Sequence, residues 1–284
     1  NVAAGTAGAA ITNTDLLALG LKINGANSGI TTVQAAALQA NLANLESSLG
    51  LAESLTTGAA VNTFAKVQAL LSLQVVRSFN DDTAAIGSKS QTAPGVSDYT
   101  NIGIKSYASL SSTSDASRVD LTDTHFSSVA GFSLQTTLNS ALDKLSTGTA
   151  LIKTDVQSMV DAYYRILQEA DGSTTTNTDV YADTASDTAN GTTYATTYND
   201  PTATDYKKVG LTKVDGTDLS LVTATNTKVL ALLNDAVGRF DVTKVDTVTE
   251  LGALEKAAEN VLPSLPVSPM VQLAIQALVL MLIG

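Results

Sequence analysis

The sequence predicts a mainly α-helical protein made of three unequal small helical repeat units, each a short turn followed by two helices. The prediction rests on a signature that occurs three times: Asp, three residues, an aliphatic residue, Gly and a second aliphatic residue. Amphipathic runs follow each copy, as in a modular scaffold rather than in an enzyme built around one cleft. The Asp and the Gly of the three repeat turns are Asp15 and Gly20, Asp98 and Gly103, and Asp205 and Gly210.

Each signature predicts a short helical turn that Asp caps and Gly stops. Asp is favoured at a helix N-cap, and Gly tolerates the positive φ at which many helices end. In the third unit, apolar residues between 229 and 237 recur at steps of three and four, which is a helical stripe. Residues 61–70 match residues 245–254 in character, and Asn62 and Asp246 are the expected N-caps of a second helix in these units.

The repeats divide the chain into segments of different composition. Thr/Asp-rich insertions interrupt the repeats, and the alternation of small and aromatic residues over 192–198 predicts a minor β-hairpin or surface strand. Asn1 in place of Met fits either a mature chain after removal of a leader or an excised piece of a longer chain. The predicted segments are an N-terminal arm (1–10), repeat 1 (11–93), repeat 2 with an insertion (94–170), an acidic Thr-rich insertion (171–200), repeat 3 (201–262) and a Pro-tethered apolar tail (263–284).

The third repeat carries a resemblance to a known class of protein. Residues 201–211, the Leu-Leu-Asn-Asp-Ala run at 232–236 and residues 245–251 resemble tandem helical repeats of very large bacterial surface proteins and adhesins. Residues 160–172 look like the end of such a module, and the likeness covers about residues 94–262 well and 11–80 weakly. The resemblance implies an extracellular location and a structural or adhesive role, and it supplies no catalytic residues.

Composition points to the same location and excludes other classes. The formal net charge is −11 with only 16 Lys and Arg residues, so no basic patch can neutralise the phosphates of a nucleic acid. Cysteine is absent, which rules out disulfides and is common in large exported bacterial structural proteins. His125 is the only histidine, and no nucleophile motif, phosphate-binding loop or dinucleotide fingerprint occurs. We therefore expect no enzyme, no catalytic residue and no cofactor.

A calcium site in the acidic insertion is the weaker of two interpretations. Asp179, Asp183 and Asp187 lie four residues apart and would share one face of a helix. No loop in this segment has the Asp and Gly spacing of a dedicated calcium site. A solvated acidic loop is therefore favoured, and no metal site is expected.

The C-terminal tail is the second strong signal in the sequence. Twelve of the fourteen residues 270–283 are apolar, and three prolines before them form a stiff connector. As a helix the tail would be about 24 Å long, short of the roughly 30 Å hydrocarbon core of a bilayer. The tail can therefore lie in its own core, dock into a neighbouring subunit or anchor in a membrane. In the docking hypothesis the residues that fill an apolar groove on another copy are Leu273, Ile275, Leu278, Leu280 and Leu282.

Together these features predict an extracellular structural protein that self-associates into a bacterial surface filament, sheath or surface layer. The alternative is a stalk or ligand-binding module of a giant bacterial adhesin. The expected partners are copies of the chain itself and cell-surface components, not nucleic acid. Membrane anchoring by the tail is the less favoured alternative.

Overall fold

The computed structural model describes residues 10–26, 29–49, 63–85, 88–107, 118–121, 131–145, 151–170, 187–189, 192–194, 201–211 and 224–261. Over these residues the protein is mainly α-helical, as the sequence predicts. The helices are α1 (Asn13–Ala18), α2 (Thr32–Ser48), α3 (Phe64–Asp81), α4 (Val96–Asn101), α5 (Leu134–Leu142), α6 (Lys153–Glu169), α7 (Ala203–Lys208), α8 (Ala224–Gly238) and α9 (Val248–Val261), with a 3-10 turn η4 (Val242–Lys244).

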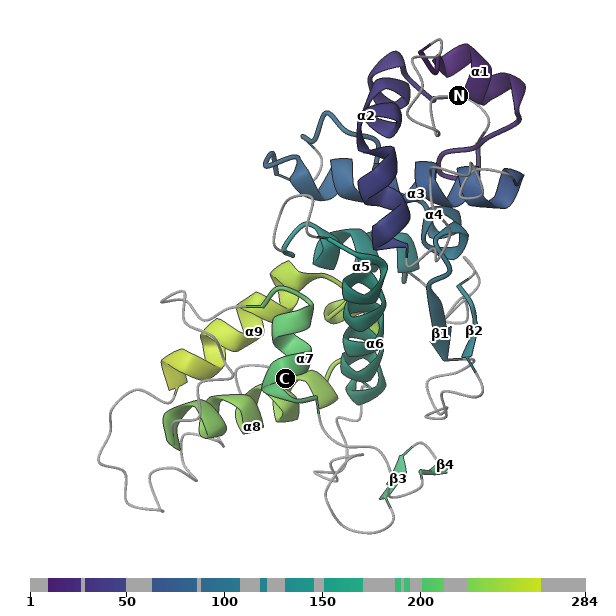
Figure 1. The fold of residues 1–284 in the computed structure, drawn as a ribbon. Coiled ribbons are helices and arrows are strands. Elements are labelled where there is room, and N and C mark those ends of the chain that lie inside the picture. Colours follow the sequence, from purple (N-terminus) through teal and green to yellow (C-terminus); the bar gives the residue numbers. More distant parts are fainter. Residues whose placement is uncertain are drawn as a thin grey trace, which may run out of the picture.

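The helices follow one another in three groups, and each group opens with a short helix. We call α1–α3 the first group, α4–α6 the second and α7–α9 the third; α1, α4 and α7 each have six residues. In the first two groups the last helix packs against the short helix of the following group, α3 against α4 and α6 against α7. The groups form an array with α1 and α2 at one end and α8 and α9 at the other (Figure 1).

Two small antiparallel hairpins accompany the helices. β1 (Lys105–Tyr107) pairs with β2 (Arg118–Asp120), and β1 lies against α6. Both strands lie within the predicted second repeat with its insertion, residues 94–170. β3 (Asp187–Ala189) pairs with β4 (Thr192–Tyr194), so the predicted hairpin forms over part of the expected segment. Asn-Gly, the favoured pair of a two-residue hairpin turn, separates these two strands in sequence.

The core of the described residues is one continuous cluster, built mainly from Leu, Val, Ile and Ala. No Trp is available, and the largest fully buried side chains are the tyrosines Tyr99, Tyr163 and Tyr206. Burial raises the pKa of Tyr99 and of Tyr163, and the Tyr206 hydroxyl donates a hydrogen bond to Asn234. None of the helices in the described ranges is both long enough and apolar enough to cross a membrane.

The helix starts differ from the predicted N-caps by one residue. α3 begins after Thr63, whose hydroxyl accepts the Lys66 N–H at 3.3 Å. α9 begins after Thr247, whose hydroxyl accepts the Glu250 N–H at 3.3 Å. The expected N-caps, Asn62 and Asp246, were wrong. The Thr that follows each of them is the N-cap instead, because its hydroxyl oxygen is placed to accept the N–H of the third helical residue.

Candidate functional site: the short helices and their contacts

The three short helices begin with one shared arrangement. Their N-cap residues are Thr12, Gly95 and Thr202, and the Asp of each signature is the third helical residue, not the cap. The carboxylate of that Asp accepts the N–H of the N-cap residue, at 2.9 Å in α1, 3.0 Å in α4 and 2.9 Å in α7. The prediction that Asp itself caps the turn was wrong. A carboxylate in the first turn reaches back to the free N–H and lies near the positive end of the helix dipole.

The same helices also end in one shared way. Gly20, Gly103 and Gly210 have φ values of +77°, +79° and +87°. The N–H of each Gly donates to the carbonyl three residues earlier, at 2.9, 2.8 and 2.9 Å. The N–H of the following residue donates to the carbonyl five residues earlier, at 3.1, 3.0 and 2.9 Å. These two bonds close each helix by a Schellman motif, which requires the left-handed backbone that Gly adopts without strain.

The environment of the three Asp side chains differs. Asp98 is fully buried, and its second oxygen accepts the hydroxyl of Ser72 on α3 at 2.9 Å. Burial raises the pKa of Asp98, and the hydrogen bonds from Gly95, Asn24 and Ser72 oppose that rise. These bonds make Asp98 a joint between the first and second groups.

Asp205 forms the corresponding joint between the second and third groups, whereas Asp15 has no such neighbour among the described residues. Asp205 is 2% exposed, and its carboxylate accepts a hydrogen bond from the guanidinium of Arg165 on α6 at 2.6 Å. Asp15 is exposed, and hydrogen bonds from Thr12 hold its pKa below the ordinary value. The same local sequence is therefore covered by a preceding helix in two places and open in the first.

Two glutamines hold the backbone just beyond the Gly of the first two turns. The Gln68 amide on α3 accepts the Lys22 N–H at 2.9 Å and donates to the Lys22 carbonyl at 2.8 Å. The Gln157 amide on α6 makes the same pair of bonds with Lys105, at 3.0 and 2.8 Å. In α9 the matching position is Gly252, so the third group has no such amide. Prediction from the sequence missed both glutamines, although Gln68 lies within residues 61–70, which were matched with residues 245–254.

Two asparagines tie the second and third short helices to the helices that follow them. The Tyr99 hydroxyl donates to Asn139 at 2.8 Å, and the Asn139 amide donates to the Pro94 carbonyl at 2.9 Å. The same chain of bonds recurs in the third group, with distances of 2.8 and 3.0 Å, through Tyr206, Asn234 and Pro201. In the first group Leu16 takes the place of the tyrosine. Sequence reasoning missed these residues too; their signal was a Leu-Asn pair in each following helix and a Pro four residues before each Asp.

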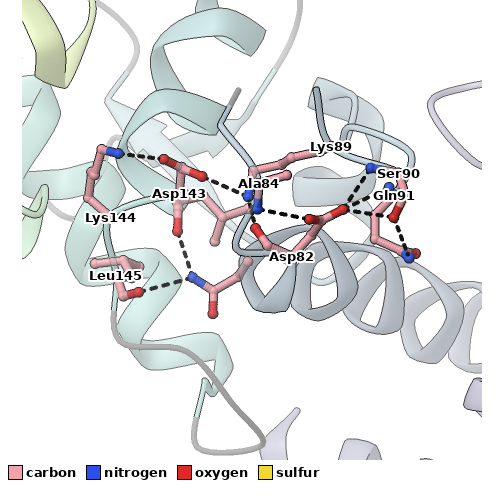
Figure 2. A network of polar contacts seen from close by, with 10 residues as sticks. Asp82, Ala84, Lys89, Ser90, Gln91, Asp143, Lys144 and Leu145 are labelled. Carbon is pink, nitrogen blue, oxygen red and sulfur yellow. Dashed lines mark hydrogen bonds and ion pairs between the residues drawn. The ribbon is translucent and has the colours of Figure 1, made fainter. Parts of the chain in front are cut away.

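Buried polar side chains fill the junction between the first two groups. The Arg77 guanidinium donates to the Leu151 carbonyl from two nitrogens, at 2.9 and 2.7 Å. The Asn80 amide donates to the Leu142 carbonyl at 2.7 Å. Figure 2 shows the neighbouring contact, in which the Lys89 ammonium meets the Asp143 carboxylate at 2.7 Å. The side chains of this ion pair are 3% and 8% exposed, so the charges lie inside the junction and not on its rim.

At the junction of the second and third groups, a carboxyl pair makes stability depend on pH. The Tyr163 hydroxyl donates to the Val245 carbonyl at 3.1 Å, directly before Asp246. Burial, a hydrogen bond with the Glu250 carboxyl and the charge of that group raise the pKa of Asp246 to about 7. Because the folded state then binds a proton that the unfolded state has lost, the free energy of unfolding falls as pH rises from about 4 to 7.

Replacing Asp246 with Asn should therefore stabilise the protein near pH 8. We expect a gain of about 1–2 kcal/mol, discounted for the partial exposure of the pair, and a flatter stability profile between pH 4 and 7. Urea unfolding at several pH values measures both. Asp15→Asn is the control, because hydrogen bonds from Thr12 lower the pKa of Asp15, which lies far from the pair, and its loss should act in the opposite direction. An Asp246→Asn variant with an unchanged pH profile would contradict the assignment.

No family model, no curated protein and no solved structure matches this chain. Within the described ranges, no group of three or more His, Asp or Glu side chains is placed to hold a metal ion. Of the residues considered for calcium, Asp187 lies in β3, and Asp179 and Asp183 lie outside the described residues, as does His125. The five apolar tail residues of the docking hypothesis, between 273 and 282, also lie outside them. The polar contacts described above therefore hold backbone segments in place and join each helix group to the next.

Proposed function

We propose that this chain is an extracellular structural protein, built from three copies of one helical unit, that self-associates into a bacterial surface filament, sheath or surface layer. The observation that carries the proposal is the recurring joint, in which the last helix of one group covers the short helix of the next. The proposed units span residues 11–93, 94–170 and 201–262. α1–α3, α4–α6 and α7–α9 lie within these limits.

The recurring contacts support copies of one unit over chance similarity. The first-turn carboxylate, the left-handed Gly and the two closing hydrogen bonds occur in all three short helices. The amide pair recurs in the first two groups, and the Tyr–Asn–Pro chain of bonds recurs in the last two. In stacked repeats each unit contacts its neighbours and stability is a sum of unit and interface terms, which suits a structural element.

The location rests on composition and on the resemblance to bacterial surface repeats. A chain of net charge −11 without cysteine suits an exported structural protein and offers no patch for nucleic acid. Labelling intact producing cells with an amine reagent that does not cross membranes tests this. Labelling of the chain on intact cells supports the surface location, and labelling only after lysis contradicts it.

A stalk or ligand-binding module of a giant adhesin is the second candidate. The exposed short helix at one end of the array favours it, because a further unit in tandem would cover α1 as α3 covers α4. Mass measurement by light scattering across a range of concentrations separates the candidates. A subunit of an assembly grows in mass with concentration, whereas a stalk module stays a monomer.

The tail supplies a test of how copies associate. We propose that residues 263–269 carry residues 270–283 onto another copy, so assembly should resist salt and weaken in detergent or on cooling. Deleting residues 267–284 should leave helical monomers, as measured by light scattering and circular dichroism. Polymers of the deleted chain would contradict docking by the tail while leaving self-association intact. A full chain that stays monomeric would contradict self-association.

A further inference from the structure

We propose that the outer face of α9 in one copy of this chain docks on α1 of a second copy, head to tail, as α3 docks on α4 and α6 on α7. The inference rests on the proposed self-association and names a second contact, which the assembly needs in addition to docking by the tail. It uses only helices of the described part of the chain, so it is separate from docking by the tail.

The first half of the contact is the open face of α1. Leu19 is 60% exposed, although it is an aliphatic residue at a helix end. Its counterparts one residue before Gly103 and Gly210, Ile102 and Val209, are 2% and 0% exposed. The signature carboxylates differ in the same way: Asp15 is exposed, whereas Asp98 and Asp205 are buried. What covers the second and third short helices is the last helix of the preceding group, and α1 has no such helix among the described residues.

The second half of the contact is the outer face of α9. On α3, the face that meets the following group carries Ser72, which bonds Asp98, and Asn80, which bonds the Leu142 carbonyl. On α6, the corresponding face carries Arg165, which bonds Asp205. Aligned from the capping residues Thr63, Ile152 and Thr247, Lys256 of α9 matches Ser72 and Asn260 matches Arg165, whereas the position of Asn80 falls beyond α9. Lys256, Asn260 and their neighbours on this face, Ala253 and Ala257, are all exposed.

The alanine at position 257 shows the difference most clearly. Its counterparts Leu73 on α3 and Ala162 on α6 are both 0% exposed. The opposite side of α9 is buried, through Val248, Leu251 and Ala258, and α9 packs against α8 and α5. Within the described part of the chain, the helix therefore has a core face like its counterparts and an exposed face where they carry a neighbouring helix.

Charge makes a second copy of this chain the partner that fits. Lys256 occupies the position of Ser72, whose hydroxyl donates to Asp98. In the proposed contact Lys256 would face Asp15 of the second copy, so an ammonium replaces a hydroxyl as the donor to the same carboxylate. Both groups are exposed in the single chain and carry opposite charges.

The position of the two faces decides the kind of assembly. α1 and α9 lie at opposite ends of the array (Figure 1), so one chain offers one face at each end. A contact between different faces of identical subunits is heterologous, and it continues into an open filament unless the rotation closes a ring. Each new copy, docked through its α1, then extends the array by three more helix groups.

A mixing experiment with two full-length variants tests the proposal. Leu19→Asp spoils the α1 face and leaves α9 intact, whereas Ala257→Glu spoils the α9 face and leaves α1 intact. Each variant alone should be monomeric at concentrations where the parent chain assembles, with association weakened about a hundredfold or more. Mixed together, they should form a one-to-one dimer, because each supplies the face that the other lacks. Light scattering gives the masses, and circular dichroism checks that both variants are folded.

Two variants of matched chemistry serve as controls. Val33→Asp places the same side chain at another exposed aliphatic residue, and its counterpart Ser133 on the second group is exposed as well. Thr249→Glu adds the same charge to α9 at a position whose counterpart Ala65 is exposed. Both should assemble like the parent chain.

The outcomes separate this contact from self-association in general. Folded Leu19→Asp or Ala257→Glu chains that still assemble would overturn the contact, and if deletion of the tail then gives monomers, the tail carries the assembly. Two monomeric variants that do not combine on mixing would also overturn it. A parent chain that is monomeric throughout would overturn the proposed self-association itself.

Discussion

Gly210→Ala should destabilise the protein more than Gly20→Ala, although both glycines end a short helix at nearly the same φ. The left-handed backbone costs an alanine about 1–2 kcal/mol at either position. A Cβ on Gly20 meets nothing within 4 Å, whereas on Gly210 it would lie 2.1 Å from Lys144 Cβ and 3.1 Å from the backbone of that residue. Overpacking of this kind adds about 1–3 kcal/mol or more, so we expect a loss of about 2–5 kcal/mol at Gly210.

Urea unfolding followed by circular dichroism measures this difference, and Gly103 provides an intermediate case. There the added Cβ would meet the Lys153 ammonium at 2.6 Å, which is the far end of a flexible side chain and can move aside. Gly103→Ala should therefore fall close to the Gly20 variant. Equal losses at all three positions would mean that the helix end alone sets the cost and that Lys144, just after α5, does not press on the third turn.

Asp143→Ala should destabilise the junction of the first two groups more than Lys89→Met. Removing Asp143 leaves the Lys89 ammonium buried beside the Asp82 carbonyl (Figure 2) and the Phe79 ring, whose centroid lies 4.9 Å from its nitrogen. Breaking a buried pair in this way costs about 3–5 kcal/mol. Removing Lys89 instead leaves Asp143 with Lys144, which it meets at 2.7 Å on the solvent side.

A double-mutant cycle measures the asymmetry of this pair. We expect about 1–3 kcal/mol for Lys89→Met and a smaller loss for Lys89→Met with Asp143→Leu than for Asp143→Ala alone, because no charge is then left buried. If the two single variants lose the same stability, the buried ammonium is not the dominant cost.

The pH dependence of the same pair follows from the carboxylate. Burial alone would raise the pKa of Asp143, but hydrogen bonds from Lys144 and Lys89 hold it below the ordinary value. The stability that the pair contributes is therefore present above about pH 4, the ordinary range of an Asp, and is lost as pH falls through the lowered pKa. Asp143→Ala should remove this part of the acid sensitivity.

Local chemistry explains why the short helices could be predicted. Threonine or glycine, a carboxylate three residues later and a glycine eight residues after the cap act within one stretch of chain, so their hydrogen bonds need no partner from elsewhere. The pattern did not show that the Asp carboxylate lies in the first helical turn rather than at the N-cap. The Asn-Gly pair of the β3–β4 hairpin is local in the same sense.

Contacts between residues far apart in the sequence could not be predicted from local patterns. β1 and β2 are ten residues apart in the sequence, and neither segment alternates strongly enough to predict a strand. The amide of Gln157 and the side chain of Asn139 act on backbone far away in sequence. Which backbone groups these side chains bond depends on how the helices pack against one another.

The sequence by itself determined that the chain is mainly helical and where its three short helices end, because capping and left-handed glycine depend on neighbouring residues. Only the tertiary structure decided what each copy of the signature does. Asp15 and Leu19 are exposed, whereas Asp98 and Ile102 are buried beneath α3, although the local patterns are the same. The physical reason is that burial belongs to the helix that covers a residue, and that helix comes from another part of the chain.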